Sequence, residues 1–111
     1  MTNGNAAPQA RLINIFKLQN NTLTSLYCAD NNNVSVSSRE EDNTDIKWII
    51  KFENSRSGHK KEYIPIANWR LGMAAGITDI TDTGFTVWGS GFLSIESARQ
   101  MVITVCIFEY S

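Results

Sequence analysis

The sequence contains little of several residue types that would indicate a particular function. It has one histidine, two cysteines and two prolines among 111 residues. Ten lysines and arginines are balanced by eleven aspartates and glutamates, so the net charge is −1. This balance argues against a nucleic-acid-binding protein, which usually carries a basic surplus. It also gives no reason to expect binding to an anionic membrane surface.

Long apolar segments are missing as well. No apolar run approaches the ~20 residues that span a bilayer, so no membrane insertion is expected. Residues 1–10 lack the basic start and apolar stretch of a signal peptide. We therefore expect a cytosolic protein or one released by a non-classical route. The length suits one domain, so we predict a flexible N-terminal arm over residues 1–10 and a single domain over residues 11–111.

What is present indicates an all-β fold. Residues 45–53 alternate between apolar and charged side chains, which is typical of a strand with one buried face. Residues 101–108 are almost continuously apolar, so we predict a strand buried on both faces. We expect an antiparallel β-sandwich of six to eight short strands with these two segments as central strands.

No stretch shows a sustained helical period. Glu62–Trp69 is predicted to be a strand at an edge or a bulge, because Pro65 lacks an amide donor. Polar or glycine-rich segments are predicted to be irregular. These are the loop Arg39–Thr44, the hairpin connection Asn54–Lys61, the flexible link Gly89–Gly91 and the polar connection Glu96–Gln100.

Catalytic and metal-binding patterns are not found in the sequence. His59 stands in a polar loop and is predicted to be solvent-exposed rather than a general base. Cys28 and Cys106 could form a disulfide in a secreted chain, but two buried free thiols are favoured. No cluster of cysteine and histidine suits zinc, and no glycine-rich loop suits a phosphate. We expect no catalytic residue, no metal, no cofactor and no enzyme activity.

Tryptophan residues are the better candidates for a binding role. Trp88 adjoins the polar segment Gly89–Gly91, and an exposed indole can stack on the apolar face of a sugar ring. The alternative is that Trp88 caps the core. Trp69 is followed by Arg70, whose guanidinium can donate two hydrogen bonds to hydroxyl groups, unless it is only a surface arginine stacked on that ring. Trp48 alternates with isoleucines and is predicted to lie in the core.

The segment ITDITDTGF over residues 77–85 resembles the I-T-x-T-G-F segment of H-type lectins. The resemblance covers the C-terminal part of the chain, where Trp88 and then the apolar residues 101–108 follow in the family's order. It implies a six-stranded antiparallel sandwich that forms a trimer and binds galactose or N-acetylgalactosamine. Arg70 and Trp88 would occupy the positions of the sugar-contacting arginine and tryptophan. The family's acidic sugar ligand has no counterpart that can be placed in this sequence.

Two functions remain open. The first is a lectin-like, galactose-type carbohydrate-binding protein that uses Trp88, Arg70, Ser90 and Asp82 and has glycans as partners. Single sugar sites are weak, so a homo-oligomer is expected, and the resemblance implies a trimer. The alternative is a structural or assembly protein, such as a viral or phage particle component or a toxin accessory subunit. The polar arm and the apolar run Leu71–Ile77 favour this alternative.

Overall fold

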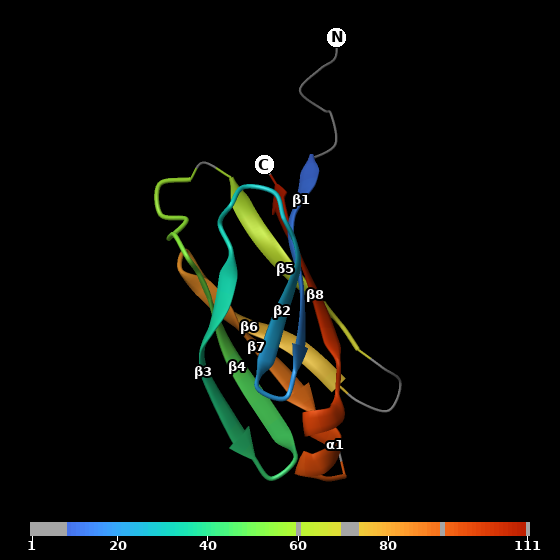
Figure 1. Cartoon of the computed structure of the whole chain (residues 1–111). Helices are drawn as coiled ribbons and strands as arrows, with labels where there is room; N and C mark the ends of the chain where they lie inside the picture. The colour runs from blue at the N-terminus through green and yellow to red at the C-terminus, as the bar shows by residue number, and fades with distance from the viewer. Residues whose placement is uncertain (1–8, 60, 70–73, 92, 111) are drawn as a thin grey trace.

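A computed structural model of the chain describes residues 9–59, 61–69, 74–91 and 93–110. Strands make up most of these residues, and one short helix precedes the last strand (Figure 1). The elements are β1 (Ala10–Gln19), β2 (Thr22–Cys28), β3 (Val34–Asp42), β4 (Asp45–Phe52), β5 (Glu62–Asn68), β6 (Ala74–Thr81), β7 (Gly84–Ser90), α1 (Ile95–Gln100) and β8 (Ile103–Tyr110). The predicted arm, residues 1–10, falls outside the described residues except for Gln9 and for Ala10, which begins β1.

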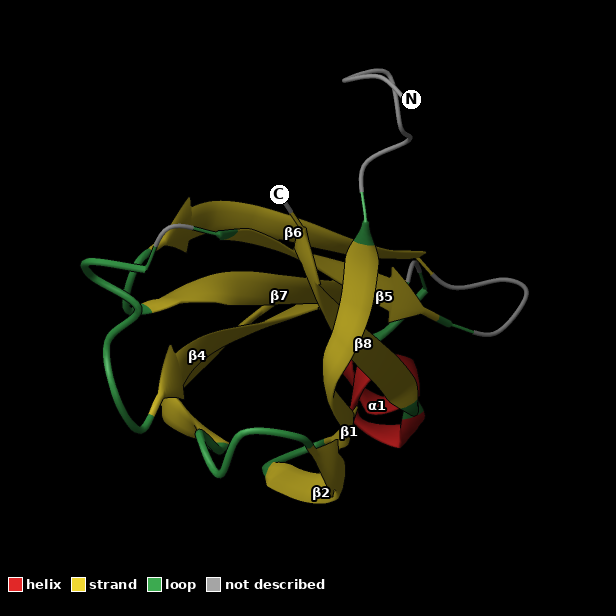
Figure 2. Cartoon of the chain, turned by 90° about the horizontal axis from the view of Figure 1, so that it is seen from above, coloured by secondary structure: helices red, strands yellow, loops and turns green. Residues whose placement is uncertain are grey.

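The strands form two antiparallel sheets that pack against each other, which confirms the predicted all-β sandwich (Figure 2). The first sheet has the order β2-β1-β8-β5, and the second sheet has the order β3-β4-β7-β6. β4 and β8 are therefore central strands, as predicted. None of the described helices is long and apolar enough to cross a membrane.

The core between the sheets follows from the alternation of side chains along each strand. In β4, Ile46, Trp48 and Ile50 are fully buried, so the predicted core position of Trp48 is confirmed. β8 also alternates, with every second side chain buried and the others half-buried. The prediction of a strand buried on both faces is therefore wrong, because no third layer covers the outer face of the first sheet among the described residues.

Two segments predicted to be irregular belong to strands. Arg39–Thr44 was expected to be a loop, but β3 continues to Asp42 because its residues pair with β4, from Arg39 opposite Trp48 to Asp42 opposite Asp45. Gly89 lies inside β7. A Cβ there would lie 3.0 Å from the Ile103 side chain, so the glycine lets β7 pack closely against the core in place of forming a flexible link.

Two connections also differ from expectation. Asn54–Lys61 is not a hairpin, because β4 and β5 belong to different sheets and the segment crosses between them. Residues 96–100 belong to α1, whose N-cap Ser94 accepts a hydrogen bond from the Ser97 amide. A helix of six residues is too short to reveal a helical period in the sequence. Ala98 and Met101 bury their side chains where α1 closes one end of the sandwich.

The positions of β5 and of the cysteines follow from the pairing. β5 is an edge strand, as Pro65 indicated. Cys28 pairs with Asn14 on one side of β1, and Cys106 pairs with Ile15 on the other side. Two strand spacings, about 10 Å, separate such positions, which is too far for a disulfide. Both thiols are free and partly exposed rather than fully buried as expected.

A buried ion pair closes the other end of the sandwich. Arg56, in the connection between β4 and β5, donates a 2.8 Å hydrogen bond to Glu109 on β8. Both side chains are almost completely buried, and Arg11 adds a second bond to the same carboxylate at 3.0 Å. The hydrogen bond from Arg56 holds the pKa of Glu109 below its usual value. The connection is thus anchored in the core by a charge that the sequence pattern did not reveal.

Replacing Glu109 with glutamine is expected to lower the free energy of unfolding by roughly 3 kcal/mol, because Arg56 would keep a buried charge without its partner. Chemical denaturation measures this change. Glu53→Gln is the matched control, since Glu53 is exposed and its replacement should change stability by less than about 0.5 kcal/mol. Equal effects of the two variants would contradict a structural role for the pair.

The same pair predicts how stability depends on pH. The folded-state pKa of Glu109 is depressed below its ordinary value of 4.5, so its stabilising effect is complete above that pH and is lost as the pH falls through the folded pKa. The stability difference between the wild type and Glu109→Gln should therefore be largest near neutrality and shrink below pH 4.5. A difference that stays constant down to pH 2, measured by denaturation at each pH, would contradict this account.

Candidate functional site

Trp88 lies on the outer surface of the second sheet. Phe85 and Val87 on the same strand are buried, and the alternation of β7 turns Trp88 to the opposite face. Its side chain is 38% exposed. The ring therefore does not cap the core, and its position favours the other predicted role, that of a surface on which a sugar ring can stack.

Neighbouring strands fix the orientation of the Trp88 ring. The indole Nε1 donates a 2.7 Å hydrogen bond to the hydroxyl of Thr78 on β6. From β4, the Lys47 ammonium lies 5.2 Å from the ring centroid, a cation–π contact. Gly76 is the cross-strand partner of Trp88 on β6, and no atom of the described residues lies within 4 Å of where its side chain would be. These residues therefore leave the β6 side of the ring uncovered.

Acidic residues lie around the ring in cross-strand rows. Lys47 is paired with Trp88 on one side and with Glu40 on the other, and its ammonium forms a 2.9 Å ion pair with Glu40. In the adjacent row, Asp45 stands between Asp42 and Ser90. These groups border a hollow of about 200 Å³, which is lined by Glu40, Glu41, Asp42, Asp45, Lys47 and Trp88.

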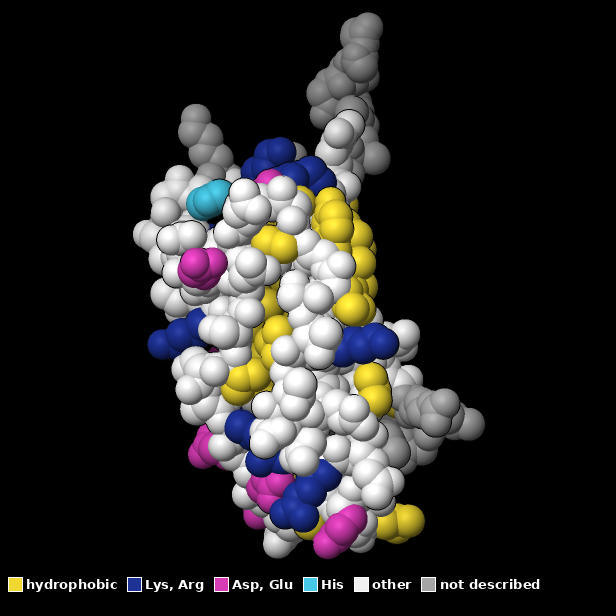
Figure 3. Space-filling view, in the orientation of Figure 1, with side chains coloured by type: hydrophobic (Ala, Val, Ile, Leu, Met, Phe, Trp, Pro, Cys, Tyr) yellow, Lys and Arg dark blue, Asp and Glu magenta, His cyan; other side chains and the backbone are white. Residues whose placement is uncertain are grey.

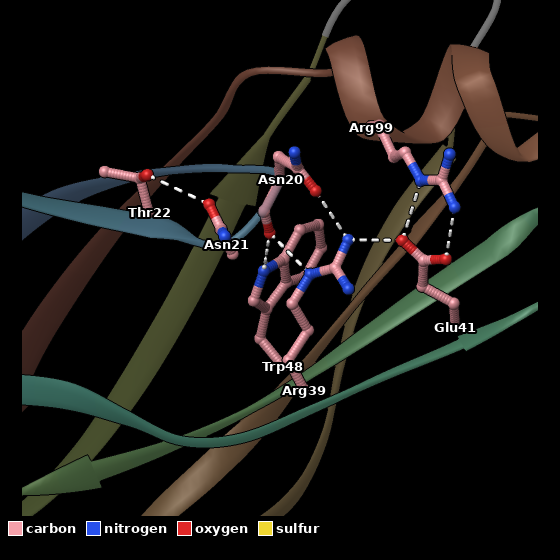
Figure 4. Close-up of polar contacts among 7 residues, drawn as sticks. All are labelled: Asn20, Asn21, Thr22, Arg39, Glu41, Trp48 and Arg99. Carbon is pink, nitrogen blue, oxygen red and sulfur yellow. Dashed lines mark hydrogen bonds and ion pairs between the residues drawn. The ribbon is translucent and has the colours of Figure 1, made fainter.

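The hairpin that carries these acidic residues is held in place by a network of polar contacts (Figure 4). Glu41 on β3 accepts two hydrogen bonds from Arg99 of α1, at 2.8 and 2.7 Å, and one from Arg39 at 2.6 Å. Bonds from Arg99 and then Arg39 lower the pKa of Glu41 to about 2, so it stays ionised. The helix and β3 are thereby joined at the wall of the hollow.

The same network ties this end of the second sheet to the first sheet. Asn20, in the turn between β1 and β2, has a φ of 53°, a conformation that asparagine tolerates better than most residues. Its backbone carbonyl accepts hydrogen bonds from the Trp48 indole and from Arg39, both at 2.8 Å (Figure 4). The turn between β3 and β4 is equally tight, with Asn43 at a φ of 30°. Its Thr44 carbonyl accepts a 2.9 Å bond from Gly91.

The residues predicted for the site do not all come together. Trp88 and Ser90 share the outer face of β7, and Ser90 is beside Asp45. Asp82 lies in the turn between β6 and β7, at the far end of the strand from Ser90. Arg70 lies outside the described residues. The structure thus keeps two of the four predicted residues in one place.

Asp82 instead shares a second hollow with His59. This hollow is about 360 Å³, and its wall includes Arg56, Tyr63 and Thr81. His59 is exposed, as predicted. Burial raises the pKa of Tyr63 to about 12, and its hydroxyl donates to the carbonyl of Thr81, so it is not an activated nucleophile. In the part of the chain that the structure describes, no group of three or more potential ligands could hold a metal ion.

Trp69 directly follows β5 of the first sheet and lines a hollow of about 580 Å³. Its side chain is 41% exposed and follows the end of β5. Lys17 is the one charged side chain among the described residues that line this hollow. Acidic acceptors for sugar hydroxyls are therefore found beside Trp88 and not in this wall.

Sequence reasoning missed Asp42, Asp45 and Lys47. All three are ordinary surface residues of a hairpin when read along the chain. Only the pairing of β4 with β7 brings them next to Trp88. The alternation of residues 45–53 did predict that Asp45 and Lys47 share the outer face of one strand, and this was the one available signal.

Comparison of the chain with known proteins identifies no similar protein. No family model matches the chain, and no match is found among curated proteins or solved structures.

Proposed function

We propose that the chain is a lectin-like protein that binds a neutral, galactose-type sugar at Trp88, without catalysis. One observation carries this proposal: an indole of fixed orientation and the carboxylates of the neighbouring hairpin line the same hollow on the outer surface of the second sheet. The C–H face of a sugar ring can stack on the indole, while its hydroxyls donate hydrogen bonds to carboxylate oxygens. Asp42 and Asp45 are the proposed acceptors, and Ser90 and Lys47 lie within the same two rows.

The size and charge of the hollow support a small neutral ligand. Its volume of about 200 Å³ is below the roughly 300–1,000 Å³ of sites for drug-sized molecules, which suits a single sugar ring. Glu40 is paired with Lys47, and Glu41 is paired with Arg39 and Arg99. Asp42 and Asp45 leave the hollow negatively charged. Sugars that carry a carboxylate, such as sialic acids, should therefore bind more weakly than neutral ones.

Resemblance to the H-type lectins supports the same ligand class through Trp88. The acidic sugar ligand of that family has no counterpart in the C-terminal part of this chain. We propose that Asp42 and Asp45, in the hairpin of β3 and β4, take its place. Arg70 stays a proposed contact from the resemblance alone.

Replacing Trp88 with alanine is expected to weaken glycan binding at least 30-fold, since an aromatic residue at the centre of a site contributes about 2 kcal/mol or more. The measurement is a glycan-array screen followed by titration of the selected galactose-type glycan. The fold should be retained, because the indole lies outside the core.

Trp69→Ala is the matched control for that experiment, because Trp69 has a similar exposure of 41% but lies on the first sheet. It should bind the glycan as the wild type does. Loss of binding in Trp69→Ala with unchanged binding in Trp88→Ala would move the site to the larger hollow. No binding of any glycan by the folded wild type would overturn the proposal.

The alternative function is a structural or assembly protein. It is favoured by the large apolar side chains exposed on the first sheet, among them Ile64 and Ile66. Deleting residues 2–9 separates the two functions. A lectin of the proposed kind should bind its glycan with unchanged affinity, because the described residues that line the Trp88 hollow come from β3, β4 and β7. An assembly protein that docks through its arm should lose particle formation, measured by light scattering.

A further inference from the structure

The outer face of the first sheet is apolar over its central rows. Ile66, Cys106, Ile15 and Tyr27 are cross-strand neighbours from β5 to β2, and Ile64, Phe108 and Leu12 form the next row. Ile64, Ile66 and Tyr27 are 44%, 51% and 45% exposed, and the other four are partly exposed. We call these seven residues the apolar face. In the space-filling view, hydrophobic side chains follow the upper right flank, where Figure 1 places β1 and β8 (Figure 3).

The apolar face is close in area to the apolar part of a standard-size interface. Its exposed side chains form a patch on the order of 400 Å², large enough to mark an interaction site. A standard interface buries about 800 Å² per partner, and about 65% of a homodimer interface is apolar, which corresponds to roughly 500 Å². The exposed area of the apolar face is thus slightly smaller than the apolar area that one partner buries in a standard interface.

The edges of the first sheet are poorly suited to association. β5 carries Pro65, which lacks an amide donor, and the pairing of β2 with β1 is interrupted by a bulge opposite Ile15 and Phe16. Interruptions of both kinds protect edge strands from pairing with another chain. Self-association of this sheet is therefore expected through its face.

Opposite charges stand at the two ends of the apolar face. Lys17 pairs with Thr104 beyond one end, and Glu62 pairs with Tyr110 beyond the other. Lys17 forms no ion pair with any residue that the structure describes. A two-fold axis in the plane of the interface and perpendicular to the strands reverses the strand direction of the second copy. The Lys17 end of one copy then lies over the Glu62 end of the other.

We propose that the chain forms a two-fold symmetric homodimer in which the apolar faces of two copies pack against each other, with Lys17 and Glu62 paired between the copies. The occupant of the face is a second copy of the same chain. This inference does not depend on the glycan proposal, because the Trp88 site lies on the other sheet.

Ile66→Asp tests the interface. It places a charge at the centre of the buried surface in both copies, so the dimer dissociation constant should rise on the order of 100-fold or more. Sedimentation velocity should give a mass near that of the 12.4 kDa monomer for this variant and twice that mass for the wild type. Ile80→Asp is the matched control, because Ile80 is 49% exposed but lies on β6 of the other sheet, and it should remain dimeric.

A charge exchange tests the two-fold geometry. On β8, Thr104 is the cross-strand partner of Lys17, and Tyr110 is the partner of Glu62. These two positions are six residues apart along the strand, or about 20 Å. This distance exceeds the Debye length of ~10 Å, so the two charges within one copy are screened from each other. Coupling between Lys17 and Glu62 can therefore arise only between copies. Lys17→Glu and Glu62→Lys should each weaken the dimer roughly tenfold, and the double variant should restore it. Additive losses in the double variant would overturn this arrangement.

Cys106 supplies a readout inside the apolar face. In a Cys28→Ser variant it is the one remaining thiol, and its reaction with a maleimide should slow as the protein concentration rises and dimers form. A wild type that stays monomeric at about 100 µM would overturn the proposal, as would a trimer or a dimer unaffected by Ile66→Asp. Circular dichroism of each variant checks that the fold is retained.

Discussion

The pleat of the strands is the constraint on which the other features depend. Each strand must place alternate side chains between the two sheets, so the choice of buried residues also decides which residues face outward. Because Phe85 and Val87 fill the core, Trp88 has to lie on the surface of β7. On β8, burial of Val105 and Ile107 sends Cys106 and Phe108 to the outer face of the first sheet. A register shift by one residue would expose the core and remove both surfaces together.

The fold class could be predicted from the sequence, because the alternation in residues 45–53 and the many turn residues are local signals. Features that depend on contacts distant in sequence could not be predicted. The charged residues 39–42 read as a loop, and they form a strand only through pairing with β4. In the sequence, Arg56 has the surroundings of an exposed loop residue. Its burial depends on an ion pair with Glu109, which is distant in the sequence. The candidate site shows the same limit, since the segment around Trp88 marked this residue as a candidate, while Asp42 and Asp45 come near it only through pairing across the sheet.

The two outer surfaces of the sandwich have different chemistry, and this difference separates the two proposed roles. The second sheet carries an indole, carboxylates and a lysine, which suit a hydroxylated ligand. The first sheet carries aliphatic and aromatic side chains, which suit a protein surface. In the proposed dimer the apolar faces meet, and the two Trp88 sites lie on the outermost sheets of a four-layer stack. With about 10 Å between packed sheets, roughly 30 Å separates the two outermost layers. The two sites face in opposite directions, so one dimer can join two glycan-bearing surfaces.

The most direct test of the central claim uses the three indole N–H groups as separate reporters. The Trp88 indole donates to Thr78 on the surface, whereas the buried Trp48 indole donates to the Asn20 carbonyl in the turn between β1 and β2. In a proton–nitrogen correlation spectrum, with signals assigned from Trp88→Ala and Trp69→Ala, titration with galactose or N-acetylgalactosamine should shift the Trp88 signal in a saturable manner and leave the Trp48 signal unchanged. A Trp88 signal that stays in place at every sugar concentration would contradict carbohydrate binding at this site.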